Sequence, residues 1–307
     1  MPDECVQCVI TSPPYWGLRD YGVDGQIGLE ENPEKYISRL VDVFREVRRV
    51  LRGDGTLWLN LGDSYWANRS KKWSFVGKTG KPELHMLRSD GISHPFLKPK
   101  DLIGIPWRVA FALQADGWYL RSDIVWAKPN AMPESATDRP TRSHEYIFLL
   151  SKSREYYYNG EAIKEEAVSG DPNSPRGSVG VLGKTMNSGR RKQDEVGKRQ
   201  YTGFNDRYKP LEKRNKRDVW TIPTSPYPGA HFATFPPALV EPCIVAGAPE
   251  WGVVLDPFNG AGTSGLVATR CGRRYIGIEL NPDYVEISKR RIIADAPLIN
   301  GVDTPHG

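Results

Sequence analysis

Apolar residues recur along the chain with two periods, every second residue as in strands and every third or fourth as in helices. The strand pattern is expected at Cys5–Ile10, Thr56–Leu61, Tyr119–Ala127, Val253–Leu255 and Arg274–Leu280, with an antiparallel pair at Glu145–Leu150 and Glu155–Tyr158. The helix pattern predicts helices at about Pro33–Leu51, Pro106–Gln114 and Asn281–Ile293. It also predicts a helix that begins near Pro236 and another that begins after residue 262 and ends at about Cys271. Pro242 is expected to kink its helix or to end it early.

Strands alternate with helices along the chain, which predicts an α/β fold of βα units around a mostly parallel sheet. Two stretches, 65–100 and 160–217, show neither period, and they predict a long loop and an insertion. The chain therefore divides into segments 1–159, 160–217 and 218–307, of which the first and the last are expected to build one domain.

Hydrophobic residues make up 39% of the 307 residues and charged residues 26%, as in ordinary globular proteins. No apolar run approaches the ~20 residues of a membrane span, and no basic-then-apolar signal pattern opens the chain, so we expect a cytoplasmic protein with no membrane partner. Four cysteines in this length do not form a disulfide framework. Cys5 and Cys8 lie in a strand-like run, so no metal site is expected.

The net charge of +5 is unevenly distributed. Residues 184–217 hold twelve Lys or Arg against four Asp or Glu, together with Tyr201, Phe204 and Tyr208. Such a segment is either a solvated loop or a surface for a polyanion whose bases stack on aromatic rings. Charge alone leaves both interpretations open.

A glycine-rich loop, Asp256-Pro-Phe-Asn-Gly-Ala-Gly-Thr-Ser-Gly265, separates a predicted strand from a predicted helix and contains a GxGxxG. Its glycines let the backbone approach a nucleotide-type cofactor, and the helix N-terminus offers free N–H groups. Glu279, at the end of the next strand, is placed to accept hydrogen bonds from ribose hydroxyls. Asp256 argues against NAD as the cofactor, because its carboxylate would repel the pyrophosphate of NAD. The same carboxylate could instead hold an ammonium group of a different cofactor.

A second motif, Thr11-Ser-Pro-Pro-Tyr-Trp16, directly follows the first predicted strand. Its two prolines fix the backbone and leave rigid outward carbonyls. These carbonyls and the Ser12 hydroxyl can accept hydrogen bonds from an amino group, and Tyr15 offers a face on which a planar base can stack.

Together the two motifs resemble the catalytic SPPY and cofactor-binding DPFxGxG signatures of amino-group DNA methyltransferases, and their order resembles the beta class of that family. Trp107, Ile124–Pro129 and Arg142–Tyr146 are similar to segments of phage and prophage members. The resemblance implies a Rossmann-like sheet that binds S-adenosylmethionine and accepts a base flipped out of double-stranded DNA. Segments 1–159 and 218–307 would then be the catalytic and cofactor-binding halves, 65–100 a DNA-contacting loop, and 160–217 the target-recognition insertion.

The resemblance also implies a set of site residues. The catalytic residues would be Ser12, Pro13, Pro14 and Tyr15. The cofactor would be bound by Asp218, Trp220, His231, Phe232, Ala233, Asp256, Pro257, Phe258, Asn259, Gly260, Gly262, Thr263, Glu279 and Asn281. DNA would be bound by Lys198, Arg199, Lys213, Arg214 and Arg217. Family members usually carry a further strand and an acidic turn that help bind the cofactor's adenine, whereas Met1 here directly precedes the matching stretch Pro2–Cys5.

Ser12, in place of the Asp of other members, resembles the enzymes that methylate cytosine N4, so N4-methylcytosine is the expected product and N6-methyladenine the alternative. Methyl transfer is expected to be direct, with the amino protons bound by Ser12 and the Pro13 carbonyl. Three competing functions remain at this stage: an NAD-dependent oxidoreductase, a non-catalytic cofactor-binding partner subunit, and an RNA methyltransferase. A cognate restriction endonuclease as partner, and the oligomeric state, are left open.

Overall fold

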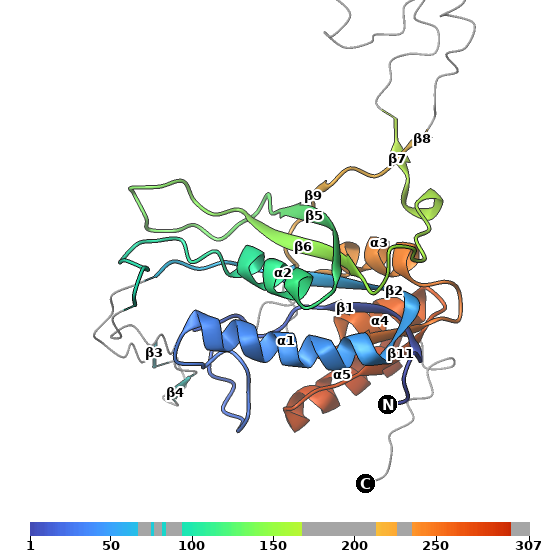
Figure 1. Cartoon of the computed structure of the whole chain (residues 1–307), viewed down its shortest axis with the longest axis horizontal. Coiled ribbons are helices and arrows are strands. Elements are labelled where there is room, and N and C mark those ends of the chain that lie inside the picture. The colour runs from blue at the N-terminus through green and yellow to red at the C-terminus, as the bar shows by residue number, and fades with distance from the viewer. Residues whose placement is uncertain (67–74, 77–81, 84–93, 168–212, 226–234, 296–307) are drawn as a thin grey trace, which may run out of the picture. The chain divides into compact units, whose positions relative to one another are not determined.

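The computed structural model describes residues 1–66, 75–76, 82–83, 94–167, 213–225 and 235–295 (Figure 1). The chain divides into two compact units, one formed by Met1–Asn159 with Arg217–Gly307 and the other by Gly160–Lys216. In the second unit, η1 (Glu161–Ile163) precedes an antiparallel pair of β7 (Glu165–Glu166) and β8 (Lys213–Arg214).

A seven-stranded sheet forms the centre of the first unit, in the order β11-β10-β1-β2-β6-β5-β9. Its strands are β1 (Val6–Thr11), β2 (Leu51–Leu61), β5 (Tyr119–Ala127), β6 (His144–Ser151), β9 (Val219–Thr221), β10 (Val253–Asp256) and β11 (Arg274–Gly277). In this sheet β6 runs antiparallel to both neighbours, and the other pairs are parallel. The predicted α/β fold with a mostly parallel sheet is confirmed. A separate short pair is formed by β3 (Phe75–Val76) and β4 (Pro82–Glu83).

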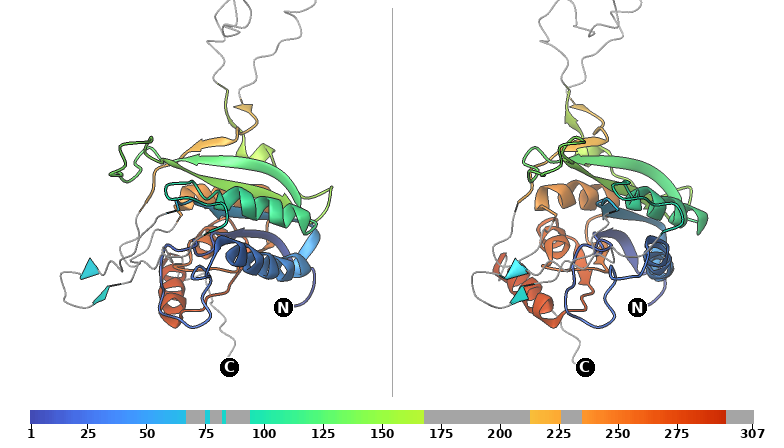
Figure 2. Two further views of the ribbon diagram at one scale, coloured as in Figure 1. Left: turned by 60° about the vertical axis from the view of Figure 1, so that its left-hand side comes forward. Right: turned by 90° about the vertical axis from the view of Figure 1, so that its left-hand side faces the viewer.

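Helices cover both faces of the sheet (Figure 2). The first face carries α1 (Pro33–Val50) and α2 (Ile105–Ala115), and the second carries α3 (Pro237–Gly247) and α4 (Thr263–Arg270), with α5 (Pro282–Asp295) against α4. Side chains of β2 alternate between the faces. Leu57, Leu59 and Leu61 join the core formed with α1 and α2, whereas Trp58 faces α3.

The helix α1 begins as its sequence predicts. The Asn32 side chain accepts a hydrogen bond from the Lys35 backbone N–H at 2.9 Å, and Pro33 occupies the first turn. None of the helices in the described part of the chain is long and apolar enough to cross a membrane.

Two sequence-based expectations for elements are wrong, namely the strand at Glu155–Tyr158 and the extension of β11 to Leu280, since β11 ends at Gly277. Residues 155–158 form no strand, and β6 pairs with β2 and β5 instead. The segment holds three consecutive tyrosines, of which Tyr158 stacks on Trp58 of β2 with 6.4 Å between ring centroids. Of the two outcomes expected at Pro242, the early end does not occur: α3 continues to Gly247, where burial of Val240, Cys243 and Ile244 offsets the missing N–H.

Candidate functional site

The two predicted motifs follow neighbouring parallel strands. The proline turn (Ser12–Tyr15) follows β1, and the glycine loop (Asp256–Gly262) begins at Asp256, the last residue of β10. Thr11 donates from its hydroxyl to Asp256 Oδ1 at 2.6 Å. A buried side-chain hydrogen bond therefore joins the two motifs at the carboxyl edge of the sheet.

The proline turn is fixed from two sides. The Tyr36 hydroxyl of α1 donates to the Pro14 carbonyl at 2.9 Å. The Tyr15 ring lies against Gly62, directly after β2, where a Cβ atom would stand 2.5 Å from Tyr15 Cε2. The ring can occupy this place only because residue 62 has no side chain.

The Tyr15 hydroxyl points toward a carboxylate that the sequence analysis did not assign. It donates to Glu145 Oε2 at 2.7 Å, and Asn60 Nδ2 donates to the same oxygen at 3.1 Å. The other oxygen of Glu145 forms an ion pair with Lys128. Ser12 Oγ donates to Tyr15 Oη at 3.5 Å. Burial, and secondly the negative charge of Glu145, raise the pKa of Tyr15 well above its ordinary value, so its hydroxyl remains a donor.

In the glycine loop, Asp256 is almost completely buried, with 1% of its surface exposed. Besides Thr11, its carboxylate accepts from Ser264 Oγ at 2.6 Å and from the Phe258 backbone N–H at 3.0 Å. Burial raises the pKa of Asp256 to about 6 despite these hydrogen bonds. Asp256 therefore organises the loop from within and places a negative charge beneath it.

Glu279 closes the other side of the glycine loop. Its Oε2 accepts the Gly260 backbone N–H at 2.7 Å and its Oε1 accepts that of Asn281 at 2.9 Å. Gly262 has φ +75°, and a Cβ there would stand 2.2 Å from Ser288 Oγ on α5, so the close approach of loop and helix requires glycine.

The other predicted loop residues support the same geometry. Asn259 Nδ2 donates to Ser288 Oγ at 2.9 Å, and Tyr275 donates to Asn259 Oδ1. Pro257 and Phe258 follow Asp256 directly, and Phe258 packs partly against the core. Thr263 begins α4 and accepts from Arg291 Nη1 at 2.9 Å. The same Arg291 nitrogen donates to the Ala261 carbonyl at 3.1 Å, a support that no sequence motif indicated.

Two predicted cofactor residues are not brought to the glycine loop. Asp218 precedes β9 and Trp220 lies within it, and four strands separate β9 from β10. Trp220 is buried and pairs with Trp126 of β5. His231, Phe232 and Ala233 lie outside the described residues. No described contact supports cofactor binding by Asp218 or Trp220, which stays a prediction.

Of the predicted DNA-binding residues, Lys198 and Arg199 lie outside the described residues. Lys213 and Arg214 form β8 of the second unit, where Lys213 is exposed and Arg214 Nε pairs with Glu165 Oε1 at 2.9 Å. In the first unit, the Arg217 carbonyl accepts from Trp220 Nε1 at 2.6 Å.

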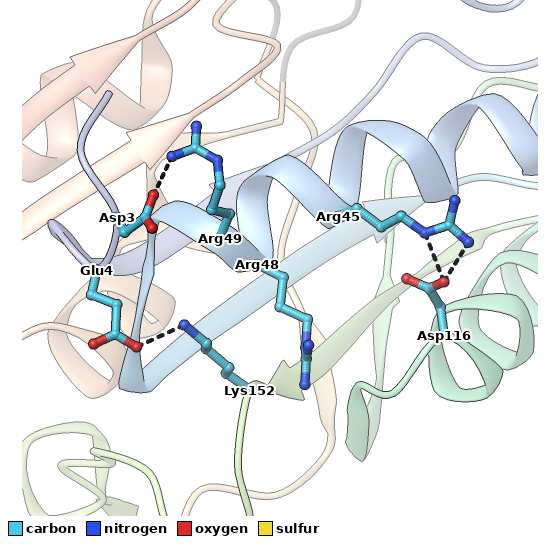
Figure 3. Close-up of a pocket in the computed structure, with 7 residues that line it drawn as sticks. All are labelled: Asp3, Glu4, Arg45, Arg48, Arg49, Asp116 and Lys152. Atoms are coloured by element: carbon cyan, nitrogen blue, oxygen red, sulfur yellow. Dashed lines mark hydrogen bonds and ion pairs between the residues drawn. The ribbon is translucent and has the colours of Figure 1, made fainter.

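A charged pocket lies at the opposite, amino edge of the sheet, where Glu4 precedes β1 and Lys152 follows β6 (Figure 3). It is lined by Asp3, Glu4, Arg45, Arg48, Arg49, Asp116 and Lys152. None of the predicted site residues lines it, so the pocket is separate from the site at the carboxyl edge.

Comparison with known proteins agrees with this arrangement. The DNA methylase family matches residues 6–290. The chain is 49% identical to the Type II methyltransferase M.Cfr9I of Citrobacter freundii over 292 residues, which cover 95% of this chain and 83% of that protein. It is also 49% identical to M.SmaI of Serratia marcescens over 293 residues, covering 95% and 86%.

Solved structures share the fold. The PvuII DNA methyltransferase, described as cytosine-N4-specific, matches with a TM-score of 0.60 at 19% identity, over 95% of this chain and 80% of that chain. A putative DNA modification methylase of Thermus thermophilus, complexed with S-adenosyl-L-methionine, matches with a TM-score of 0.56 at 24% identity, over 97% and 89%.

The family match spans both the proline turn and the glycine loop, and it decides against an NAD-dependent oxidoreductase, an RNA methyltransferase and a non-catalytic subunit. The chain belongs to the DNA methylase family, and it is an S-adenosylmethionine-dependent DNA methyltransferase.

Proposed function

We propose that this enzyme methylates the exocyclic N4 of cytosine, at a base flipped out of double-stranded DNA. The observation that carries the proposal is the proline turn, led by Ser12 and joined to the glycine loop through the Thr11–Asp256 hydrogen bond of 2.6 Å. This bond places the groups that would bind the amino group beside those that would bind the methyl donor. Ser12 in place of an aspartate favours cytosine over adenine by resemblance to N4 enzymes.

The residues of the glycine loop and Glu279 fit S-adenosylmethionine. Each Glu279 oxygen accepts one backbone N–H, and the side chain is half-buried, so acceptor positions remain for ribose hydroxyls. The Asp256 charge beneath the loop favours a cationic ligand. When bound, S-adenosylmethionine supplies a methyl group on a positively charged sulfur.

The proline turn would prepare the target amino group. Its nitrogen is a weak nucleophile, because the lone pair is delocalised into the ring. Ser12 Oγ and the Pro13 carbonyl would accept the two amino protons, which favours a tetrahedral nitrogen and directs its lone pair. The Pro14 carbonyl is already engaged by Tyr36, so it serves to fix the turn. The face of Tyr15 would stack on the flipped base.

We further propose that 160–217 is the target-recognition insertion and that 1–159 and 218–307 are the catalytic and cofactor-binding halves. The excess of positive charge in 184–217 suits the DNA backbone. As a Type II enzyme of a bacterial or phage-infected cell, the protein would act in the cytoplasm and protect DNA against a cognate restriction endonuclease.

Mass spectrometry of nucleosides from DNA treated with the enzyme tests the target base. N4-methylcytosine is the expected product. N6-methyladenine as the main product would overturn the assignment to cytosine and leave amino-group methylation intact. Carbon-5 methylcytosine would overturn both, because that reaction requires a cysteine nucleophile.

A further inference from the structure

Two segments to which the sequence analysis gave no role, Ile124–Pro129 and Arg142–Tyr146, meet beside the Tyr15 hydroxyl. The first segment contains the end of β5 and the two residues after it, and the second contains the start of β6 and the two residues before it. The pairing of the two strands brings Trp126 opposite Glu145 and Ala127 opposite His144. Lys128 and Glu145 form an ion pair there, with only 17% and 16% of their side chains exposed. The Lys128 Nζ also lies 4.2 Å from the centroid of the Trp126 ring.

The contacts of Glu145 form a directed chain toward Ser12. An ionised carboxylate accepts hydrogen bonds and donates none. The Tyr15 hydroxyl lies 2.7 Å from Glu145 Oε2 and 3.4 Å from Asn60 Oδ1, and its single proton is directed to the nearer oxygen, which belongs to the carboxylate. The Tyr15 oxygen is then available as acceptor for the Ser12 hydroxyl, which donates to it at 3.5 Å.

This direction matters for the reacting group. A serine hydroxyl both donates and accepts, unlike the aspartate found at this position in other members. If the Ser12 proton pointed at the target nitrogen, it would compete for the lone pair that must attack the methyl group. With its proton committed to Tyr15, the Ser12 oxygen presents only lone pairs to the amino group.

We infer that Glu145 is a positioning residue that sets the direction of the Glu145–Tyr15–Ser12 chain, so that Ser12 acts as an acceptor for the target amino group. Lys128 holds the carboxylate in this role, because it offers donors only and occupies the second oxygen. The inference rests on the proposed amino-group chemistry but not on which base carries the amino group.

The substitution Glu145→Gln is predicted to reverse the chain. The charge of Lys128 would attract the amide oxygen of glutamine, which turns the NH₂ group toward Tyr15 and removes the acceptor for Asn60 Nδ2. The Tyr15 oxygen would then accept from Gln and direct its own proton toward Ser12. Adding Lys128→Met removes the group that orients the amide, so in the double variant the amide oxygen can face Tyr15 again.

The test measures single-turnover methyl transfer, DNA affinity, cofactor affinity and thermal unfolding for Glu145→Gln, Glu145→Gln with Lys128→Met, and Tyr15→Phe. We expect Glu145→Gln to slow transfer roughly 10- to 100-fold, the effect of one charge-assisted hydrogen bond, with both affinities nearly unchanged. The double variant should recover at least part of the loss. Glu4→Gln is the matched control, because Glu4 pairs with Lys152 at the amino edge and should leave the rate unchanged.

Either of two results would overturn the inference. One is a wild-type rate of methyl transfer in Tyr15→Phe, a variant that tests the chain even where Glu145→Gln fails to fold. The other is a folded double variant that transfers the methyl group no faster than Glu145→Gln. A rate that merely follows thermal stability across the variants would reduce Glu145 to a structural role. The rates are measured on whichever base the wild-type enzyme methylates, so adenine methylation would overturn the proposed target base without deciding this test.

Discussion

The Asp256 carboxylate is buried, and its negative charge therefore lowers the free energy of unfolding. Its folded-state pKa is raised from 3.8 to about 6, so the fold favours the protonated acid. The corresponding stability is present at low pH and is lost as pH rises through about 6. Asp256→Asn removes the charge, so we expect the cofactor-free variant to be more stable than wild type at pH 8, by about 1–3 kcal/mol. Chemical unfolding at pH 8 and pH 5 checks this, and the difference should shrink at pH 5.

The same group should make cofactor binding depend on pH. If the Asp256 carboxylate favours the cationic cofactor, protonation below about pH 6 removes that attraction. We expect wild-type affinity for S-adenosylmethionine to fall about tenfold per pH unit below pH 6. The Asp256→Asn variant should bind more weakly at pH 8 and show a flat profile. Calorimetric titrations from pH 5 to 8 decide, and parallel profiles for the two proteins would contradict the assignment.

At the residue scale, local sequence predicted the two motifs but not their surroundings. The proline turn and the glycine loop each lie within a few consecutive residues, so their chemistry is visible in the sequence. Glu145, Asn60 and Arg291 reach the site from β6, β2 and α5. Nothing local indicates a role for Asn60 or Arg291, and the resemblance of Arg142–Tyr146 to family segments does not say what Glu145 contacts. Only strand order and register determine that these residues face the two motifs.

At the element scale, Gly62 links the end of β2 to the proline turn. A Cβ at this position would stand 2.5 Å from the Tyr15 ring, so Gly62→Ala must displace either the ring or the strand end. We expect a loss of about 1–3 kcal/mol of stability and at least tenfold slower methylation. Gly53→Ala, within β2, is the control, because nothing lies within 4 Å of a Cβ there. Equal activity of the two variants would show that the Tyr15 position is not critical.

Elements with a clear period were predicted within a few residues, as α1 and β5 illustrate. The errors have identifiable causes. Residues 155–158 are rich in tyrosine, which is typical of strands, but Tyr158 packs its ring on Trp58 without strand pairing. The helix α3 continues through Pro242 because tertiary packing buries it. The extension of β11 to Leu280 was also too long, since Ile278 and Glu279 already turn toward the glycine loop. Tertiary contacts decide these cases, and a local pattern does not contain them.

At the scale of the whole molecule, the uneven charge predicts how the enzyme binds DNA. Positive charge is concentrated in 184–217, whereas the exposed basic residues of α1 are paired with acids, as Lys35 with Glu31 and Arg45 with Asp116. Basic residues that neutralise phosphates release counterions, so each contributes about 0.9 to the slope of log affinity against log salt.

We therefore expect replacement of Lys198, Arg199 and Lys213 by Gln to flatten this slope by roughly two to three units. The control replaces Lys35, Arg45 and Arg49 of α1 by Gln, which removes the same number of charges and should leave the slope unchanged. Titrations of labelled duplex DNA between low and physiological salt measure both, and cofactor affinity should stay at the wild-type value. If the two triple variants flatten the slope equally, only net charge matters and 160–217 is not the DNA-binding surface. If only the α1 variant flattens it, the duplex lies along the first unit instead.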